Sequence, residues 1–226
     1  MTAPLTIRKP DASPKGGVIV IMEAFGITEH IIDVAEQAAK AGYLAVIPDL
    51  FHRKGEAIVV AYDDIPAAIE VMQTVTPESA AADVDDAVAY LKSEGLSLKQ
   101  IGIVGFCMGG TVTFHTAVRL PLGAAVTFYG GGVAAGRMGY ESFIDEVAKL
   151  QTPWLGQFGE ADRGIPVADL ELLRIKGEKI EQLVEIDIYP EAQHGFHRPG
   201  DSGVFHPAAS AAAWKRAIAW FDAHIG

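Results

Sequence analysis

Short apolar runs alternate with longer amphipathic stretches along the chain, and this alternation predicts buried strands separated by helices. The run from Val18 to Met22 is apolar throughout and rich in β-branched residues, as in a strand buried on both faces. Runs of the same character occupy residues 43–47, 101–104, 124–128, 154–158 and 183–188. Strands that alternate with helices in this way form a mostly parallel sheet covered on both faces. The predicted fold class is therefore α/β.

Helix signals occupy the segments between these runs. Thr28 can cap a helix that Gly42 ends, and Thr76 with Pro77 opens another that closes at Gly95. Further helices are predicted over residues 108–120, 139–151, 166–181 and 207–224. No repeat, linker or shift in composition interrupts the series, so we expect one domain over residues 1–226.

The composition fits a globular chain with an acidic surface. Of 226 residues, 50% are hydrophobic and 21% are charged, which argues against disorder. The formal net charge of −11 opposes binding to nucleic acid or to anionic membranes. The single cysteine cannot form an internal disulfide, no apolar leader opens the chain, and no apolar run approaches the ~20 residues of a membrane span. We therefore expect a cytoplasmic protein with no nucleic-acid or membrane partner, and leave its oligomeric state, monomer or dimer, open.

A cysteine stands where a predicted strand meets a predicted helix. Residues 105–110 read Gly-Phe-Cys-Met-Gly-Gly, which is the G-x-nucleophile-x-G elbow with Cys107 in the nucleophile position. A helix N-terminus favours the thiolate, and the Met108 N–H is placed for one half of an oxyanion hole. A buried structural cysteine beside a glycine turn is the alternative interpretation.

An elbow nucleophile needs a base, and the base needs a carboxylate that orients it. Asp162 follows the strand 154–158, and His194 follows the strand 183–188. The order nucleophile, acid, histidine is that of α/β-hydrolases, and all three residues fall at the carboxyl ends of strands. Taken alone, Asp162 could be a turn residue and His194 an ordinary loop histidine. Together with the elbow, they predict a Cys-His-Asp triad.

The remaining histidines leave one other site to consider. His197 and His206 share a loop with His194, which raises the possibility of a metal site there. Neither a cysteine nor paired carboxylates stand at ligand spacing, so we expect no metal. The other four histidines fall in predicted helices, after a strand or at the chain end, and are given no role: His30, His52, His115 and His224.

The elbow, Asp162 in Gly-x-x-Asp and the His194-Gly195-Phe196 segment together resemble the dienelactone hydrolase (carboxymethylenebutenolidase) family. Two further segments match it, Met22-Glu23-Ala24-Phe25-Gly26 and Pro48-Asp49-Leu50-Phe51, so the resemblance runs from about residue 16 to the C-terminus. It implies an α/β-hydrolase fold, no cofactor, and a small ester or lactone substrate opened through a thiolester on Cys107.

The resemblance also implies roles for residues around the thiol. Glu23 would contact the resting thiol and help to deprotonate it when substrate binds, and the Ala24 N–H would complete the oxyanion hole with Met108. A nearby carboxylate raises a thiol pKa, so the resting cysteine would stay protonated and protected from oxidation. Tyr129 matches a pocket tyrosine and Phe25 a pocket-wall aromatic, although either could be plain core.

Family members bind the substrate carboxylate with two arginines, and this sequence matches only one of them, Arg198. No arginine occurs between Arg53 and Arg119, where the second is expected. The loss of a buried charge-assisted contact costs about 1.5–3 kcal/mol, so a neutral ester is an alternative to a dienelactone.

Two other classes of protein compete with the hydrolase. A redox or stress protein would use an exposed thiol without acyl chemistry, although no second cysteine is present to resolve it. A dinucleotide-binding protein would need G-x-G-x-x-G after its first strand, whereas Gly105, Gly109 and Gly110 have different spacing and follow a later strand.

Overall fold

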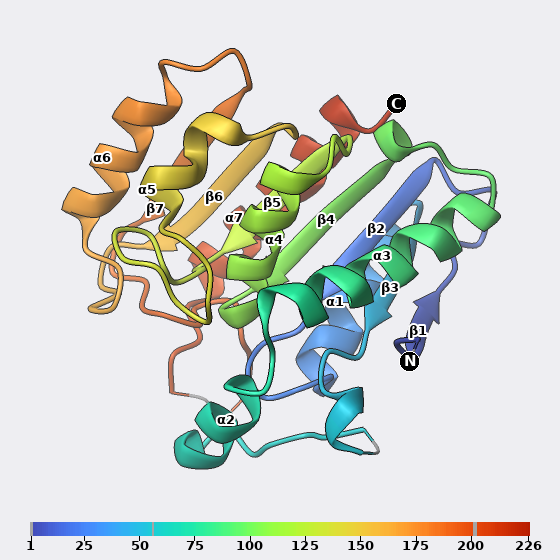
Figure 1. The fold of residues 1–226 in the computed structure, drawn as a ribbon, viewed down its shortest axis with the longest axis horizontal. Helices are drawn as coiled ribbons and strands as arrows, with labels where there is room; N and C mark the ends of the chain where they lie inside the picture. The colour runs from blue at the N-terminus through green and yellow to red at the C-terminus, as the bar shows by residue number, and fades with distance from the viewer. Residues whose placement is uncertain (1, 56, 201–202) are drawn as a thin grey trace.

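The computed structural model describes residues 2–55, 57–200 and 203–226, and these residues form a seven-stranded sheet (Figure 1). The strands are β1 (Leu5–Arg8), β2 (Gly16–Ile21), β3 (Tyr43–Pro48), β4 (Ile101–Phe106), β5 (Ala124–Phe128), β6 (Trp154–Gly159) and β7 (Val184–Tyr189). Their order is β1-β3-β2-β4-β5-β6-β7, with β1 antiparallel to β3 and every other pair parallel. The predicted α/β class with a mostly parallel sheet is confirmed.

Helices cover both faces of this sheet, as predicted. Figure 1 shows α3 and α4 in front of the strands and α1 and α7 behind them. The helices are α1 (Glu29–Lys40), α2 (Ile65–Met72), α3 (Pro77–Ser93), α4 (Met108–Arg119), α5 (Phe143–Glu146), α6 (Val167–Gly177) and α7 (Pro207–His224), with short 3-10 turns η1 (His52–Lys54), η2 (Leu98–Gln100) and η3 (Val147–Lys149). Helices on both faces are needed because the residues of β2 to β6 point alternately to the two faces and are all buried.

The edge strand β1 lies in a segment that the sequence pattern left as polar. Its residues are only half buried and pair in register with β3, from Leu5 opposite Pro48 to Arg8 opposite Ala45. One partner strand and two flanking prolines suit an edge position, where one row of backbone groups stays unpaired. A four-residue strand that is only half buried has too few apolar residues to be predicted from the hydrophobic pattern of the sequence.

The helix predicted over residues 139–151 is wrong in extent. The Ser142 side chain accepts the Asp145 N–H and starts a single α-turn, which passes into the 3-10 turn η3. Leu150 then leaves the helical region, and the Gln151 N–H donates to the Ala117 carbonyl at the end of α4. The short element results because the chain must turn back to enter β6 three residues later. The sequence also missed α2, whose apolar residues face partly into solvent.

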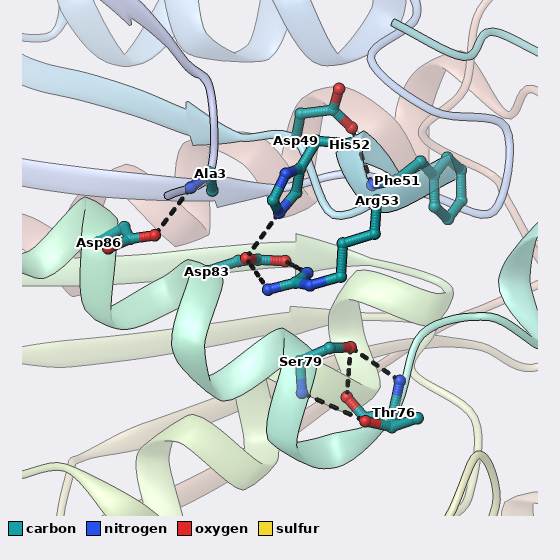
Figure 2. A network of polar contacts seen from close by, with 9 residues as sticks. All are labelled: Ala3, Asp49, Phe51, His52, Arg53, Thr76, Ser79, Asp83 and Asp86. Atoms are coloured by element: carbon teal, nitrogen blue, oxygen red, sulfur yellow. Dashed lines mark hydrogen bonds and ion pairs between the residues drawn. The ribbon is translucent and has the colours of Figure 1, made fainter. Parts of the chain in front are cut away.

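A buried polar network fastens the turn after β3 to helix α3 (Figure 2). The Asp83 carboxylate is fully buried and accepts two hydrogen bonds from Arg53, at 2.7 and 2.8 Å. His52 Nε2 lies 3.1 Å from the same carboxylate, and Asp49 caps the turn by accepting the Phe51 N–H at 2.8 Å. These bonds fix the start of the segment that leads over the carboxyl ends of the strands to α2.

The carboxyl ends of the strands carry the residues that the sequence singled out. Glu23 follows β2, Cys107 follows β4, Tyr129 follows β5, Asp162 follows β6 and His194 follows β7. The parallel arrangement of these strands places all five at one edge of the sheet. No helix within the described ranges combines the length and apolarity that a membrane crossing requires.

Candidate active site

Cys107 occupies a strained position between β4 and α4. Its φ of 53° and ψ of −111° lie in a region that side chains other than glycine rarely adopt. The turn is closed by backbone contacts: a Cβ on Gly105 would lie 2.1 Å from the Gly109 carbonyl oxygen, and one on Gly109 would lie 2.5 Å from that of Ile21. The elbow therefore needs its glycines. It leaves the Cys107 residue partly exposed at the N-terminus of α4.

The structure brings Cys107, His194 and Asp162 together from three strand ends. His194 Nδ1 lies 2.7 Å from Asp162 Oδ2, and the imidazole also hydrogen-bonds to the Cys107 side chain. Asp162 is 5% exposed and is held by the Gly164 N–H, which donates to Oδ1 at 2.8 Å. A cavity of about 680 Å³ opens beside Asp162 and His194. The contacts run in the order thiol, imidazole, carboxylate.

The charges of this group favour a thiolate beside an imidazolium. Burial raises the pKa of the Cys107 thiol, but the charge and hydrogen bond of His194, with a smaller effect from Arg137, lower it below its ordinary value. Burial lowers the pKa of His194, but the Cys107 thiolate and the Asp162 carboxylate raise it to about 10. Each of the two groups therefore favours the charged form of the other.

The two amides that the sequence assigned to an oxyanion hole, those of Met108 and Ala24, have no backbone acceptor in the described part of the chain. Met108 is the first residue of α4, so its N–H lacks an acceptor within the helix. Ala24 lies in the turn after β2 and is 7% exposed. Among the residues that the structure describes, no backbone oxygen accepts the N–H of either one. Both amides therefore have hydrogen-bonding capacity to spare for an oxygen that carries developing charge.

Glu23 is fully buried, and its two carboxylate oxygens face different partners. Oε1 accepts a hydrogen bond from the Tyr129 hydroxyl at 3.3 Å and lies 3.7 Å from Arg198 Nη1. Oε2 lies 3.4 Å from His30 Nδ1. Burial raises the pKa of Glu23, but the hydrogen bond and charge of His30, followed by the charges of Arg198 and His194, bring it below its ordinary value.

The Glu23 charge does raise the thiol pKa, as expected, but it does not prevail. The opposing effect of His194 is larger, so the pKa of the Cys107 thiol is lowered rather than raised. That the resting cysteine stays protonated remains a prediction; the imidazole, which that prediction left out, acts on the pKa of the thiol in the opposite direction to the carboxylate. The hydrogen-bond partners of the Glu23 carboxylate are Tyr129 and His30.

The residues expected to bind substrate gather around Glu23. The Arg198 guanidinium lies over two rings, 4.8 Å from the centroid of Phe25 and 4.6 Å from that of Tyr62. Tyr129 is buried and packs edge-on against His194 at 5.2 Å between centroids. Phe25, Tyr129 and Arg198 thus join the catalytic candidates in one cluster, although Phe25 and Tyr129 are also part of the buried core.

Sequence reasoning missed three charged or polar residues of this region. His30 and His197 are 4% and 5% exposed, and His30 Nε2 lies 2.9 Å from His197 Nδ1. Arg137, in the loop after β5, lowers the pKa of the Cys107 thiol through its charge, although this is the smallest of the effects on that group. A usable signal existed for His30, which falls seven residues after Glu23 on the inner face of α1.

The three histidines of the loop after β7 bind three different partners. His194 pairs with Asp162, His197 with His30, and the His206 side chain accepts the Ala209 N–H at the start of α7. Their ring nitrogens therefore do not converge on one point. Within the described ranges, no group of three metal-ligating side chains is arranged to hold an ion.

The model of the dienelactone hydrolase family matches residues 4–225 of this chain. The chain belongs to the dienelactone hydrolase family. The family resemblance read from the motifs is confirmed, and the chain is a hydrolase of the dienelactone hydrolase type, with the α/β-hydrolase fold.

Individual relatives agree over nearly the whole length of this family member. A Yersinia pestis protein named "Putative carboxymethylenebutenolidase" is 33% identical over 98% of this chain and 84% of its own length. A Pseudomonas putida protein named "Carboxymethylenebutenolidase" is 26% identical over 93% of this chain and 87% of its own length. A crystal structure from Klebsiella pneumoniae, described as a "Putative Dienelactone Hydrolase", has a TM-score of 0.85 at 31% identity, covering 97% of this chain and 92% of that one.

Proposed function

We propose that this family member cleaves a small ester or lactone through a thiolester formed on Cys107. The observation that carries the proposal is the ordered contact of the Cys107 thiol with His194 and of His194 Nδ1 with Asp162 at 2.7 Å. The lowered pKa of the thiol supplies a nucleophile, and the raised pKa of His194 supplies an acid for the leaving group.

The chemistry follows from these positions. The Cys107 thiolate attacks the carbonyl carbon, and the resulting oxyanion accepts hydrogen bonds from the Ala24 and Met108 amides. His194 is protonated beside the thiolate because its pKa is raised; it gives its proton to the departing oxygen, and the thiolester forms. His194 then takes a proton from water, the hydroxide displaces the thiolate, and the carboxylic acid product leaves. Asp162 keeps the imidazole in the required tautomer throughout.

Glu23 gives the cycle a second acceptor for the proton of the Cys107 thiol when the substrate is anionic. A substrate carboxylate at Arg198 competes with Glu23 for the guanidinium, which now lies 3.7 Å from Glu23 Oε1. The charge of Arg198 helps to hold the pKa of Glu23 low, so its diversion toward substrate makes Glu23 a stronger base. This supports the role that the family resemblance implies for Glu23, triggered by substrate binding.

The direct test combines intact-protein mass spectrometry with hydrolysis of an activated aryl ester. We expect a transient acyl adduct on the wild-type protein, no adduct and no turnover in Cys107→Ala, and a loss of at least about 100-fold in His194→Gln. His115→Gln is the matched control, because His115 belongs to α4, the helix that Cys107 precedes, and its ring packs on Phe114, Tyr140 and Phe143. Retained turnover in Cys107→Ala overturns the assignment; fast sulfenylation without acylation favours a redox protein instead.

A neutral ester is the second candidate substrate, and the state of Arg198 favours it. The guanidinium already faces Glu23 and lies over two aromatic rings, and the sequence has no arginine between Arg53 and Arg119. A lactone that carries a carboxylate should be compared with its methyl ester. A higher kcat/KM for the methyl ester supports the neutral class, whereas a preference for the acid supports a dienelactone-like substrate bound by Arg198 and the charge of Arg137.

A further inference from the structure

A chain of two histidines leads away from Glu23 on the side opposite Arg198. His30 Nδ1 lies 3.4 Å from Glu23 Oε2, and His30 Nε2 lies 2.9 Å from His197 Nδ1. Both imidazoles are at least nine-tenths buried, and both line a cavity of about 440 Å³ between α1 and α7, which we call the α1–α7 groove. The triad chemistry uses neither histidine, although such rings are costly to bury without a purpose or a partner.

The hydrogen bonds of Glu23 decide which of its oxygens exchanges a proton. Tyr129 and Arg198 both direct donors at Oε1, so an added proton must sit on Oε2, which faces His30. When Glu23 is ionised, His30 donates Nδ1–H to it and accepts Nδ1–H of His197 on Nε2. When Glu23 is protonated, every bond reverses, and each ring carries its hydrogen on Nε2. Both states satisfy the chain with neutral imidazoles.

We propose that His30 and His197 form a proton path that connects Glu23 with the α1–α7 groove. Glu23 O–H gives its proton to His30 Nδ1, His30 gives its Nε2 proton to His197 Nδ1, and His197 gives its Nε2 proton to water in the groove. One proton enters and one leaves, and both rings end in the opposite tautomer. The path rests on the proposed function, because it clears the proton that Glu23 takes from the Cys107 thiol when substrate engages Arg198.

The surroundings favour a neutral His197 ring at the groove end of this path. Burial and the neighbouring His30 lower the pKa of His197 to about 3, so His197 accepts and passes protons without holding a charge. Phe106, Phe128 and Trp214 pack around the His197 ring. The charged side chains at the groove are Asp33 from α1 and Lys215 from α7, one of each sign. Arg198 and His194 face Glu23 from its other side.

The tautomers can be read without any substrate. In ¹⁵N-edited NMR spectra of histidine-labelled protein, the wild type should show Nδ1–H in both His30 and His197. In Glu23→Gln, the two donors at Oε1 hold the amide oxygen there, so the amide NH₂ faces His30 and mimics the protonated acid. We expect both rings to change to Nε2–H, including His197, which does not touch residue 23. An unchanged His197 tautomer overturns the proposal, whatever the protein hydrolyses.

A kinetic arm tests whether the path carries protons during turnover. With a carboxylate-bearing ester, His197→Phe should lower kcat at least about tenfold with little change in KM, because the ring nitrogens vanish while the packing remains. His197→Ala should lose activity similarly and regain it as imidazole is added to the buffer, which a merely structural role would not permit. The control His115→Ala should show no imidazole dependence.

The two proposals fail in distinguishable ways. If the wild type forms no acyl adduct, the proposed function falls while the NMR arm still decides on the path. If the wild type acylates and His197→Phe turns over normally, the path is overturned and the Cys107 chemistry stands.

Discussion

At the scale of single residues, the reactivity of Cys107 depends on one neighbour. The pKa of its thiol is lowered because the charge of His194 outweighs burial and the Glu23 carboxylate, and the pKa of His194 is about 10. The thiolate should therefore persist to lower pH than that of an ordinary cysteine, whose pKa is about 8.5. We predict that the rate of Cys107 modification by iodoacetamide has its midpoint at a lower pH than the rate for a free cysteine. In His194→Gln, burial and Glu23 are opposed only by the smaller effect of Arg137, so the pH midpoint of the modification rate should move to alkaline values.

Replacement of Glu23 should shift the thiol pKa in the direction opposite to replacement of His194. Glu23→Gln takes away a carboxylate that raises the thiol pKa, so the midpoint should move further to the acidic side. Midpoints that move in the same direction for both variants would contradict this account of the thiol.

His115 makes the stability of the fold depend on pH. Burial lowers its pKa to about 4, its Nε2 has no partner among the described residues, and its ring stacks on Tyr140 at 4.3 Å. Below the unfolded-state pKa of about 6.5 the unfolded chain binds a proton that the folded chain refuses, so stability falls as pH drops from there toward 4. The loss reaches at most about 2 kcal/mol at pH 5. His115→Phe keeps the stack and should remove this loss in urea unfolding measured at pH 7 and pH 5.

The candidate residues that could be identified from the sequence are those that directly follow a predicted strand. Cys107, Asp162 and His194 each follow a strand, and the carboxyl ends of parallel strands meet at one edge. His30 and His197 lie 167 positions apart, one on a helix and one in a loop, so no spacing joins them. The balance of charges at the thiol was equally out of reach, because it depends on which partner touches the sulfur.

At the scale of elements, the turn after β3 depends on a buried carboxylate in α3. Asp83 is fully buried between Arg53 and His52, whereas Asp85 of the same helix pairs with Arg119 while 53% exposed. Loss of one partner from a buried pair costs about 3–5 kcal/mol, and loss of an exposed pair costs about 0–1 kcal/mol. We predict losses of these sizes for Asp83→Asn and Asp85→Asn in urea unfolding. Equal losses for the two would show that the network in Figure 2 does not anchor the turn.

The elements that the sequence predicted well are those whose own residues decide them. Residues 124–128 form a strand and 207–224 a helix with the predicted bounds, because a continuous apolar run and a proline at the first helical turn are local signals. The edge strand β1 forms because β3 offers it a partner, and residues 139–151 break early because the chain must reach β6. Such tertiary demands override local pattern.

At the scale of the whole molecule, the fold should unfold as one unit, as the sequence predicts. Strand β4 joins the β1-β3-β2 side of the sheet to the β5-β6-β7 side. One hydrophobic cluster runs through both sides, and the Tyr43 hydroxyl of β3 donates to Asp222 of α7 at 2.7 Å. Neither side can lose its packing without exposing apolar surface of the other.

Paired core truncations test this unity. Leu44 of β3 and Leu155 of β6 lie on opposite sides of β4 and are 1% and 0% exposed. Replacement of either by alanine should cost about 2–5 kcal/mol. Amide hydrogen exchange is measured in β3 and in β6 at increasing urea concentration. Because the core is shared, each variant should lower the urea concentration at which protection is lost by the same amount in both strands. If Leu44→Ala lowered protection in β3 alone, the two sides would be separate cooperative units, and the edge that aligns the thiol, the imidazole and Glu23 would be an interface between domains.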